Sequence, residues 1–152
     1  MIEITHEALD PAAVTARVAR DSNGAVVTFL GTTRNFTGDR QVLHLEYEAY
    51  RPMADAKLGE IADEMRRRWP VDVAISHRLG RLEIGDISLV VAVGSPHRKD
   101  AFEACQYSVD RIKQIVPIWK KEFFAGGEVW VGSQEDPPTQ EPAHAPASRS
   151  QT

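Results

Sequence analysis

Residues 87–116 read ISLVVAVGSPHRKDAFEACQYSVDRIKQIV, an apolar, β-branched run that leads into a segment with helical periodicity. The run at residues 87–94 predicts a strand. Ser95 followed by Pro96 is typical of a helix start, with serine as the N-cap and proline as the first helical residue. We expect this helix to continue to about Val116, where Pro117 stops it. One face carries its small and apolar residues, Ala101, Ala104, Cys105, Ser108, Ile112 and Ile115.

Strands and helices are predicted on both sides of this unit. Asp10-Pro11 predicts a short helix to about Arg20, and Pro52 begins a helix with an apolar stripe that ends before Pro70. Residues 80–86 are expected to form a turn. Alternating or β-branched runs predict strands at residues 2–5, 25–30, 42–48, 71–79, 118–124 and 128–131. Helices among mostly hairpin-connected strands predict one α+β domain with a largely antiparallel or mixed sheet.

The last nineteen residues differ from the rest in composition. Residues 134–152 hold four of the nine prolines and no large apolar side chain. Such a composition predicts a disordered tail, because it cannot bury enough apolar surface to order the chain. The ordered domain is therefore expected to span residues 1–133, and removal of the tail should leave folding intact.

Composition and charge exclude several classes of protein. The net charge of −4 argues against general nucleic-acid binding, and the apolar runs are shorter than the roughly 20 residues of a membrane helix. We see no basic leader, so a soluble, cytoplasmic protein is expected. Cys105 is the single cysteine, which rules out an intrachain disulfide, and its place on an apolar helix face favours a buried, inert thiol. The histidines are scattered, so no metal site is predicted.

Two regions could bind an anion. A polar loop at residues 31–41 contains Thr32, Thr33 and Arg34, but it could equally be a solvated connection in which Arg34 pairs with Asp39. Between residues 97 and 121 positive charge is in surplus, and His97-Arg98 comes at a helix start, where free amides favour an anion. The alternative there is an ordinary solvated first turn.

Lysines around the end of the long helix form the third candidate. Lys113 is followed closely by Lys120 and Lys121, with aromatic residues nearby. A lysine that loses water beside other cations has a lowered pKa and suits proton transfer. The competing interpretation is that these lysines lie along apolar surface with their ammonium groups in solvent.

Several short motifs together resemble the catalytic (large) subunit family of molybdopterin synthase. Each motif is weak alone, but their joint order is specific and covers most of residues 1–132. They are GAVVTF (24–29), GTTRN (31–35), LEYEAY (45–50), HRLG (77–80), PHR (96–98), AFEAC (101–105), DRIK (110–113) and VPIWKKE (116–122). After Trp130 the chain reads VGSQ, where some relatives place a basic side chain.

The resemblance implies an α/β hammerhead-like fold and a sulfurtransferase. It implies a homodimer within a heterotetramer, whose small ubiquitin-like sulfur-carrier subunit ends in a Gly-Gly thiocarboxylate. The implied substrate is cyclic pyranopterin monophosphate, which would become the dithiolene of molybdopterin in molybdenum cofactor biosynthesis. No metal and no resident cofactor are implied, and because the thiocarboxylate is the nucleophile, no catalytic cysteine is needed.

The resemblance also implies roles for individual residues. Lys113 would be the principal acid and base, assisted by Lys120, while Arg34, His97 and Arg98 would bind the phosphate. The implied substrate pocket consists of Thr32, Thr33, Arg34, His97, Arg98, Lys113, Lys120, Lys121 and Glu122.

Helix geometry adds a constraint to these roles. Sixteen residues of one helix separate His97 from Lys113 by about 24 Å, too far for both to touch one small pterin. We therefore expect a site shared across a dimer, with His97 and Arg98 from one protomer. A non-catalytic module that binds an anionic metabolite or a partner's tail is the alternative function, and single-stranded nucleic-acid binding is disfavoured by the acidic charge.

Overall fold

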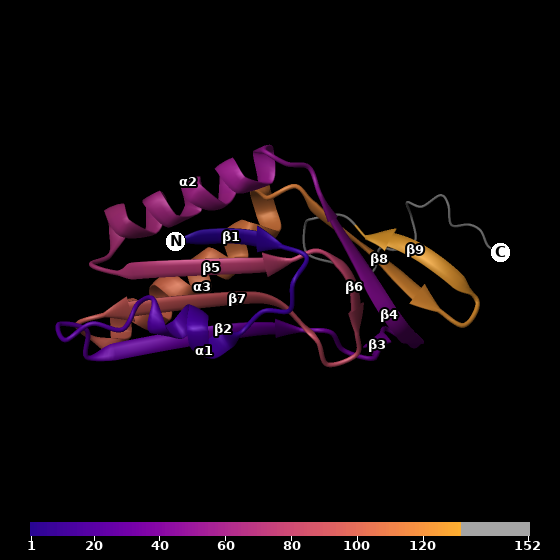
Figure 1. Ribbon diagram of the computed structural model, residues 1–152, viewed down its shortest axis with the longest axis horizontal. Coiled ribbons are helices and arrows are strands. Elements are labelled where there is room, and N and C mark those ends of the chain that lie inside the picture. The colour runs from indigo at the N-terminus through magenta and orange to yellow at the C-terminus, as the bar shows by residue number, and fades with distance from the viewer. Residues whose placement is uncertain (132–152) are drawn as a thin grey trace.

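The computed structural model describes residues 1–131, which form a four-stranded and a five-stranded sheet side by side, with the helices on the four-stranded one (Figure 1). The elements in chain order are β1 (Ile2–Thr5), α1 (Pro11–Ala16), β2 (Ala25–Thr32), β3 (Phe36–Thr37), β4 (Arg40–Ala49), α2 (Met53–Arg68), β5 (Asp72–Arg78), β6 (Gly80–Glu83), β7 (Ile87–Ser95), α3 (Arg98–Ile115), β8 (Ile118–Phe124) and β9 (Gly127–Val131).

The four-stranded sheet carries most of the hydrophobic core. Its strand order is β1-β5-β7-β2, with β1 parallel to β5 and the other pairs antiparallel. Successive residues of a strand point to opposite faces, so Ile75 and Val91 pack in the cluster with α2 and α3, whereas Ala74 and Val90 pack against residues of α1 and the turn after it. Because both faces are covered, the central strand β7 is buried along nearly its whole length.

The second sheet continues the fold beyond the ends of β5 and β7. Strand β4 pairs with β8 and β6, β8 pairs with β9, and β3 forms a short hairpin with β4. In Figure 1 this sheet lies to the right of the helices, and the C-terminal end of α3 leads directly into β8. The two sheets therefore meet where α3 ends.

The predicted α+β class, with one mixed and one antiparallel sheet, is confirmed. Two loops predicted from sequence are wrong in part. Residues 80–83 form β6, because Gly80 at φ +90° turns the chain directly out of β5 and Leu82 is buried opposite Leu45 of β4. Within the loop predicted at residues 31–41, β2 extends to Thr32 and Phe36–Thr37 pair with the start of β4.

The start of α3 differs from the prediction. Its N-cap is His97, and Ser95 is the last residue of β7. The Ser95 hydroxyl is fully buried and donates to the Pro70 carbonyl at 3.2 Å, so it cannot cap the helix. At the other end, α3 stops at Ile115 with Val116 as its C-cap, in agreement with the sequence.

The first helix is capped as predicted but is shorter. Asp10 accepts hydrogen bonds from the amides of Ala12 and Ala13 at 3.1 and 3.4 Å. The helix ends at Ala16 instead of near Arg20, because the following turn changes to three-residue spacing, with the Val18 amide bonded to the Thr15 carbonyl.

The predicted tail at residues 134–152 and the boundary at residue 133 lie outside the described residues. Within residues 1–131, none of the helices is both long and apolar enough to cross a membrane.

Candidate functional site

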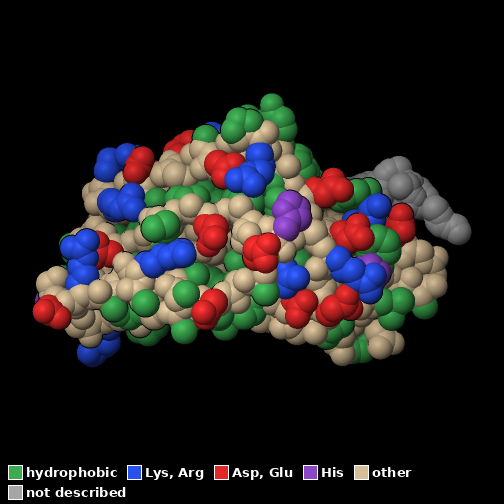
Figure 2. All heavy atoms as spheres, in the orientation of Figure 1, with side chains coloured by type: hydrophobic (Ala, Val, Ile, Leu, Met, Phe, Trp, Pro, Cys, Tyr) green, Lys and Arg blue, Asp and Glu red, His purple; other side chains and the backbone are tan. Residues whose placement is uncertain are grey.

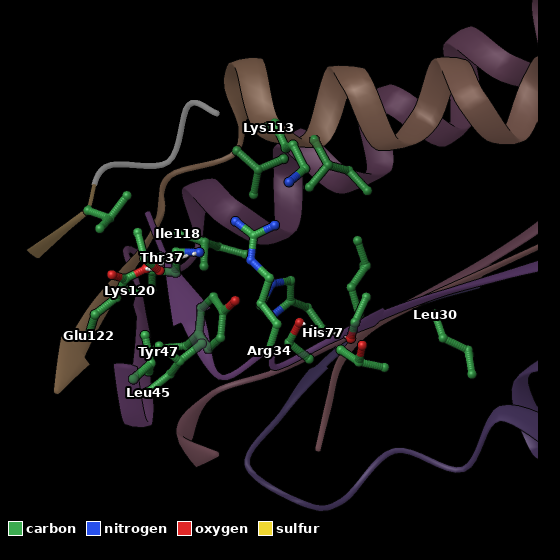
Figure 3. A pocket seen from close by; sticks show the side chains of 18 of the residues that line it. Leu30, Arg34, Thr37, Leu45, Tyr47, His77, Lys113, Ile118, Lys120 and Glu122 are labelled. Atoms are coloured by element: carbon green, nitrogen blue, oxygen red, sulfur yellow. Dashed lines mark hydrogen bonds and ion pairs between the residues drawn. The ribbon is translucent and has the colours of Figure 1, made fainter. Parts of the chain in front are cut away.

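A cavity of ≈ 470 Å³ lies where the two sheets meet the end of α3 (Figure 3). Strands β2 and β7 form one wall, β4 and β8 form another, and the last turn of α3 stands over them. The side chains with polar groups that line it are Thr32, Arg34, Thr37, Tyr47, His77, Ser88, Lys113, Lys120 and Glu122.

Three cationic side chains line this cavity from separate elements. Arg34 comes from the connection after β2, Lys113 from the last turn of α3 and Lys120 from β8. Lys120 faces the cavity because alternate residues of a strand point to the same side. Ile118, Lys120 and Glu122 therefore lie on one face of β8, and all three line the cavity. Cations gathered in a partly enclosed space bind an anion better than isolated surface cations do.

Glu122 is buried, and its two oxygens differ: Oε2 contacts Thr37 and Lys120, whereas Oε1 has no hydrogen-bond partner among the described residues. It accepts a hydrogen bond from the Thr37 hydroxyl at 3.1 Å, and its carboxylate lies 3.6 Å from the Lys120 ammonium and 4.0 Å from the Arg40 guanidinium. The carboxylate thereby ties the β3–β4 hairpin to β8 and holds Lys120 in place. It balances part of the positive charge of the cavity and leaves Arg34 and Lys113 outside its ion pairs.

Two polar aromatic side chains on this cavity were not predicted as site residues. Tyr47 of β4 and His77 of β5 contact each other edge to face, with ring centroids 5.2 Å apart. Burial lowers the pKa of His77 to about 4, so its imidazole is neutral at pH 7. His77 is one of the scattered histidines of the sequence; the available signal was its position near the end of the strand predicted at residues 71–79.

The structure brings together five of the nine predicted pocket residues, namely Thr32, Arg34, Lys113, Lys120 and Glu122. The other four lie elsewhere within the protomer. Thr33 is buried beside the cavity, where its amide donates to the Asp86 carbonyl. His97 and Arg98 are at the opposite end of α3 from Lys113.

Lys121 lies on the other face of β8. Its ammonium is 4.7 Å from the centroid of the Trp130 ring and 3.5 Å from the Glu128 carboxylate. The sequence-based alternative, a lysine stem that covers apolar surface, therefore describes Lys121 in this protomer, whereas Lys120 faces the cavity.

Cys105 lies on the core-facing side of α3 and is buried, as the sequence predicts. Burial raises its pKa to about 11, so the thiol stays protonated at neutral pH. It does not line the cavity. In the described part of the chain, histidine, cysteine and carboxylate side chains form no group of three or more that could hold a metal ion.

Fold and cavity together define an α+β protein whose cation-lined pocket suits an anionic ligand. The family described as "MoaE protein" matches residues 4–115, and the chain belongs to this family.

Two catalytic subunits of molybdopterin synthase are close relatives in sequence. The one from Halalkalibacterium halodurans is 52% identical over 119 residues, which cover 78% of this chain and 76% of the relative. The one from Bacillus subtilis is 47% identical over 133 residues, covering 87% and 85%. A solved structure of molybdopterin synthase from Staphylococcus aureus superposes with a TM-score of 0.82 at 45% identity, covering 85% of this chain and 95% of that one.

Proposed function

We propose that this chain is the catalytic subunit of a molybdopterin synthase. It transfers sulfur from the thiocarboxylated C-terminus of a small carrier subunit to cyclic pyranopterin monophosphate, giving the dithiolene of molybdopterin. The convergence of Arg34, Lys113 and Lys120 on one cavity carries the proposal, because the substrate is anionic and the reaction needs positioned proton donors and acceptors. A cytoplasmic location goes with this function.

The three cationic side chains have different roles because their chemistry differs. Arg34 binds a phosphate oxygen through its planar guanidinium, which cannot act as an acid at neutral pH. Lys113 is the principal acid and base, since its ammonium points into the cavity from the end of α3 (Figure 3). Lys120, held by Glu122 at 3.6 Å, assists it.

The sulfur nucleophile comes with the carrier. The carrier is a ubiquitin-like protein, and its C-terminal Gly-Gly thiocarboxylate enters the cavity. The protonated, buried thiol of Cys105 plays no part, and Cys105 is not among the residues that line the cavity. The assembly is a homodimer of catalytic subunits with a carrier at each end.

His97 and Arg98 complete the site from the second protomer of the homodimer. The support is the length of α3, which is continuous from Arg98 to Ile115 and separates His97 from Lys113 by about 24 Å. One protomer cannot place both on one small pterin. Thr33 and Lys121 stay in the proposed set of substrate residues, although neither lines the cavity of one protomer: Thr33 is buried beside it, and Lys121 lies on the opposite face of β8.

Subunit exchange tests the shared site. A His97→Ala/Arg98→Ala variant is mixed with Lys113→Ala under conditions that exchange protomers. Half of the dimers are then mixed, and each holds one intact site, so about a quarter of the wild-type activity should return. Absence of recovery after exchange has been verified would show that each site is built from one chain.

Reconstitution tests the function itself. The purified chain is incubated with thiocarboxylated carrier and cyclic pyranopterin monophosphate, and dithiolene formation is followed. A carrier with an ordinary C-terminal carboxylate is the control and should give no product. If the chain bound both reactants yet formed no dithiolene, it would instead be a module that binds an anionic metabolite or a partner's tail.

Nucleic-acid binding is not favoured. On the face drawn in Figure 2, acidic and basic side chains are interspersed and form no continuous basic stripe. The net charge of −4 also opposes a phosphate backbone.

A further inference from the structure

His77 is a buried histidine that lines the cavity, and the proposed sulfur transfer gives it no role. It lies on β5 and is 5% exposed, and its ring packs edge to face against Tyr47. Figure 3 shows it among the labelled side chains that line the pocket. Buried polar groups in proteins normally have hydrogen-bond partners, so a partner is expected for each of the two ring nitrogens.

One nitrogen is fixed by the backbone. Nδ1 of His77 lies 2.9 Å from the carbonyl oxygen of Arg78. A carbonyl only accepts, so Nδ1 carries the hydrogen and donates it. In a neutral ring the other nitrogen, Nε2, then has a free lone pair, and within the described residues it has no hydrogen-bond partner.

The cationic side chains that line the cavity cannot accept a hydrogen bond from a ligand. Arg34 and Lys113 carry only donors. Glu122 is an acceptor, but Thr37 and Lys120 occupy its Oε2 atom, and its Oε1 atom, which has no hydrogen-bond partner among the described residues, is buried and lies 4.0 Å from the Arg40 guanidinium. Burial keeps the His77 ring neutral, with its pKa lowered to about 4, so the cations do not compete with an imidazolium for the phosphate.

We propose that Nε2 of His77 accepts a hydrogen bond from a ring N–H or amino group of the pterin. The inference rests on the proposed function and deepens it, because it separates two kinds of recognition. The cations bind the phosphate, and His77 recognises the heterocycle through a hydrogen bond. A pterin offers several N–H donors, and a rigid, neutral acceptor in a buried site discriminates against rings that lack one.

Two substitutions separate the two nitrogens. In His77→Asn the side-chain amide can still donate to the Arg78 carbonyl, but nothing remains at the position of Nε2. In His77→Gln the longer side chain places its amide oxygen near that position. We expect His77→Asn to weaken binding of cyclic pyranopterin monophosphate about tenfold, and His77→Gln to stay within about threefold of wild type.

Inorganic phosphate is the control ligand, since it has no heterocycle. It should bind wild type, His77→Asn and His77→Gln equally. A purely structural role for His77 would weaken phosphate and pterin binding together and would overturn the proposal. Equal pterin affinity in wild type and His77→Asn would also overturn it.

Nitrogen NMR of the labelled protein gives an independent readout. The His77 Nε2 resonance should be that of an unprotonated nitrogen in the free protein and should move when the pterin binds but not when phosphate binds. A protonated Nε2 would contradict the inference. If the wild-type chain bound no pterin at all, the proposed function would fail instead, so the two failures are distinguishable.

Discussion

The two sheets of this molecule have opposite surroundings. In the first sheet β7 is buried from Ser88 to Ser95, with helices α2 and α3 on one face and α1 on the other. In the second sheet β8 buries fully only Ile118 and Glu122 of its seven residues. The first sheet therefore supplies most of the buried core and also one wall of the cavity, while the second presents Lys120 and Tyr47 to a ligand. The comparison suggests that stability and chemistry can be altered separately.

The largest difference between an effect on activity and an effect on stability is expected for Lys113, where the two sheets meet. Lys113→Ala should lower sulfur transfer by about 10²–10⁴-fold, the usual contribution of a positioned acid or base. Its melting temperature should stay near that of wild type, since Lys113 is not part of the core. Lys57→Ala on α2, which removes only an exposed ion pair with Glu60, is the matched control. Near-normal turnover of Lys113→Ala would remove its assigned role.

Truncation of one apolar residue in each sheet should sharpen the contrast. Ile75 of β5 is fully buried, and Ile75→Ala should cost about 2–5 kcal/mol of the free energy of unfolding. Leu43 of β4 is 50% exposed, and Leu43→Ala should cost about 0.5 kcal/mol or less. Urea unfolding of both variants measures the difference. Equal losses would mean that the second sheet is as important for stability as the first.

A smaller effect is expected where α2 and α3 meet. Arg111 and the Tyr107 hydroxyl both donate to Glu64, at 2.9 and 2.6 Å, and hold the pKa of that carboxyl at about 2, below its ordinary 4.5. The depressed pKa stabilises the folded state above pH 4.5, and this stabilisation is lost as the pH falls toward 2.

Glu64→Gln should therefore lower the free energy of unfolding at pH 7 by about 1–3 kcal/mol. Between pH 4.5 and 2 its stability should fall less steeply than that of wild type, as measured by urea unfolding at several pH values. Glu60→Gln, at an exposed pair on the same helix, serves as the control and should change little. Parallel pH curves for Glu64→Gln and wild type would show that the pair contributes nothing.

Periodicity in the sequence predicted the core elements well, because their burial depends on local patterns. It missed β6, since four residues that begin with glycine resemble a turn until Leu82 is placed opposite Leu45. It also placed the cap of α3 at Ser95, because the competing partner, the Pro70 carbonyl, is distant in sequence.

The sequence predicted some residues of the candidate site and missed others, again because contacts between distant parts of the chain leave no local pattern. Lys113, Lys120 and Arg34 were candidates from residue type and position, the family resemblance gave them roles, and the structure places all three on one cavity. His77 carried no chemical motif of its own. Its role depends on a backbone carbonyl and on Tyr47, a neighbour thirty positions away in the chain, and neither contact can be read from a pattern in the sequence.

The cation-lined cavity also has a consequence for how quickly a ligand arrives. The whole chain carries a net charge of −4, so at long range it repels an anionic substrate weakly. Attraction from Arg34, Lys113 and Lys120 is felt only within about 8 Å at physiological ionic strength. Association should therefore be governed by ordinary diffusion to the mouth of the cavity, with little electrostatic steering, and added salt should affect the dissociation rate more than the association rate.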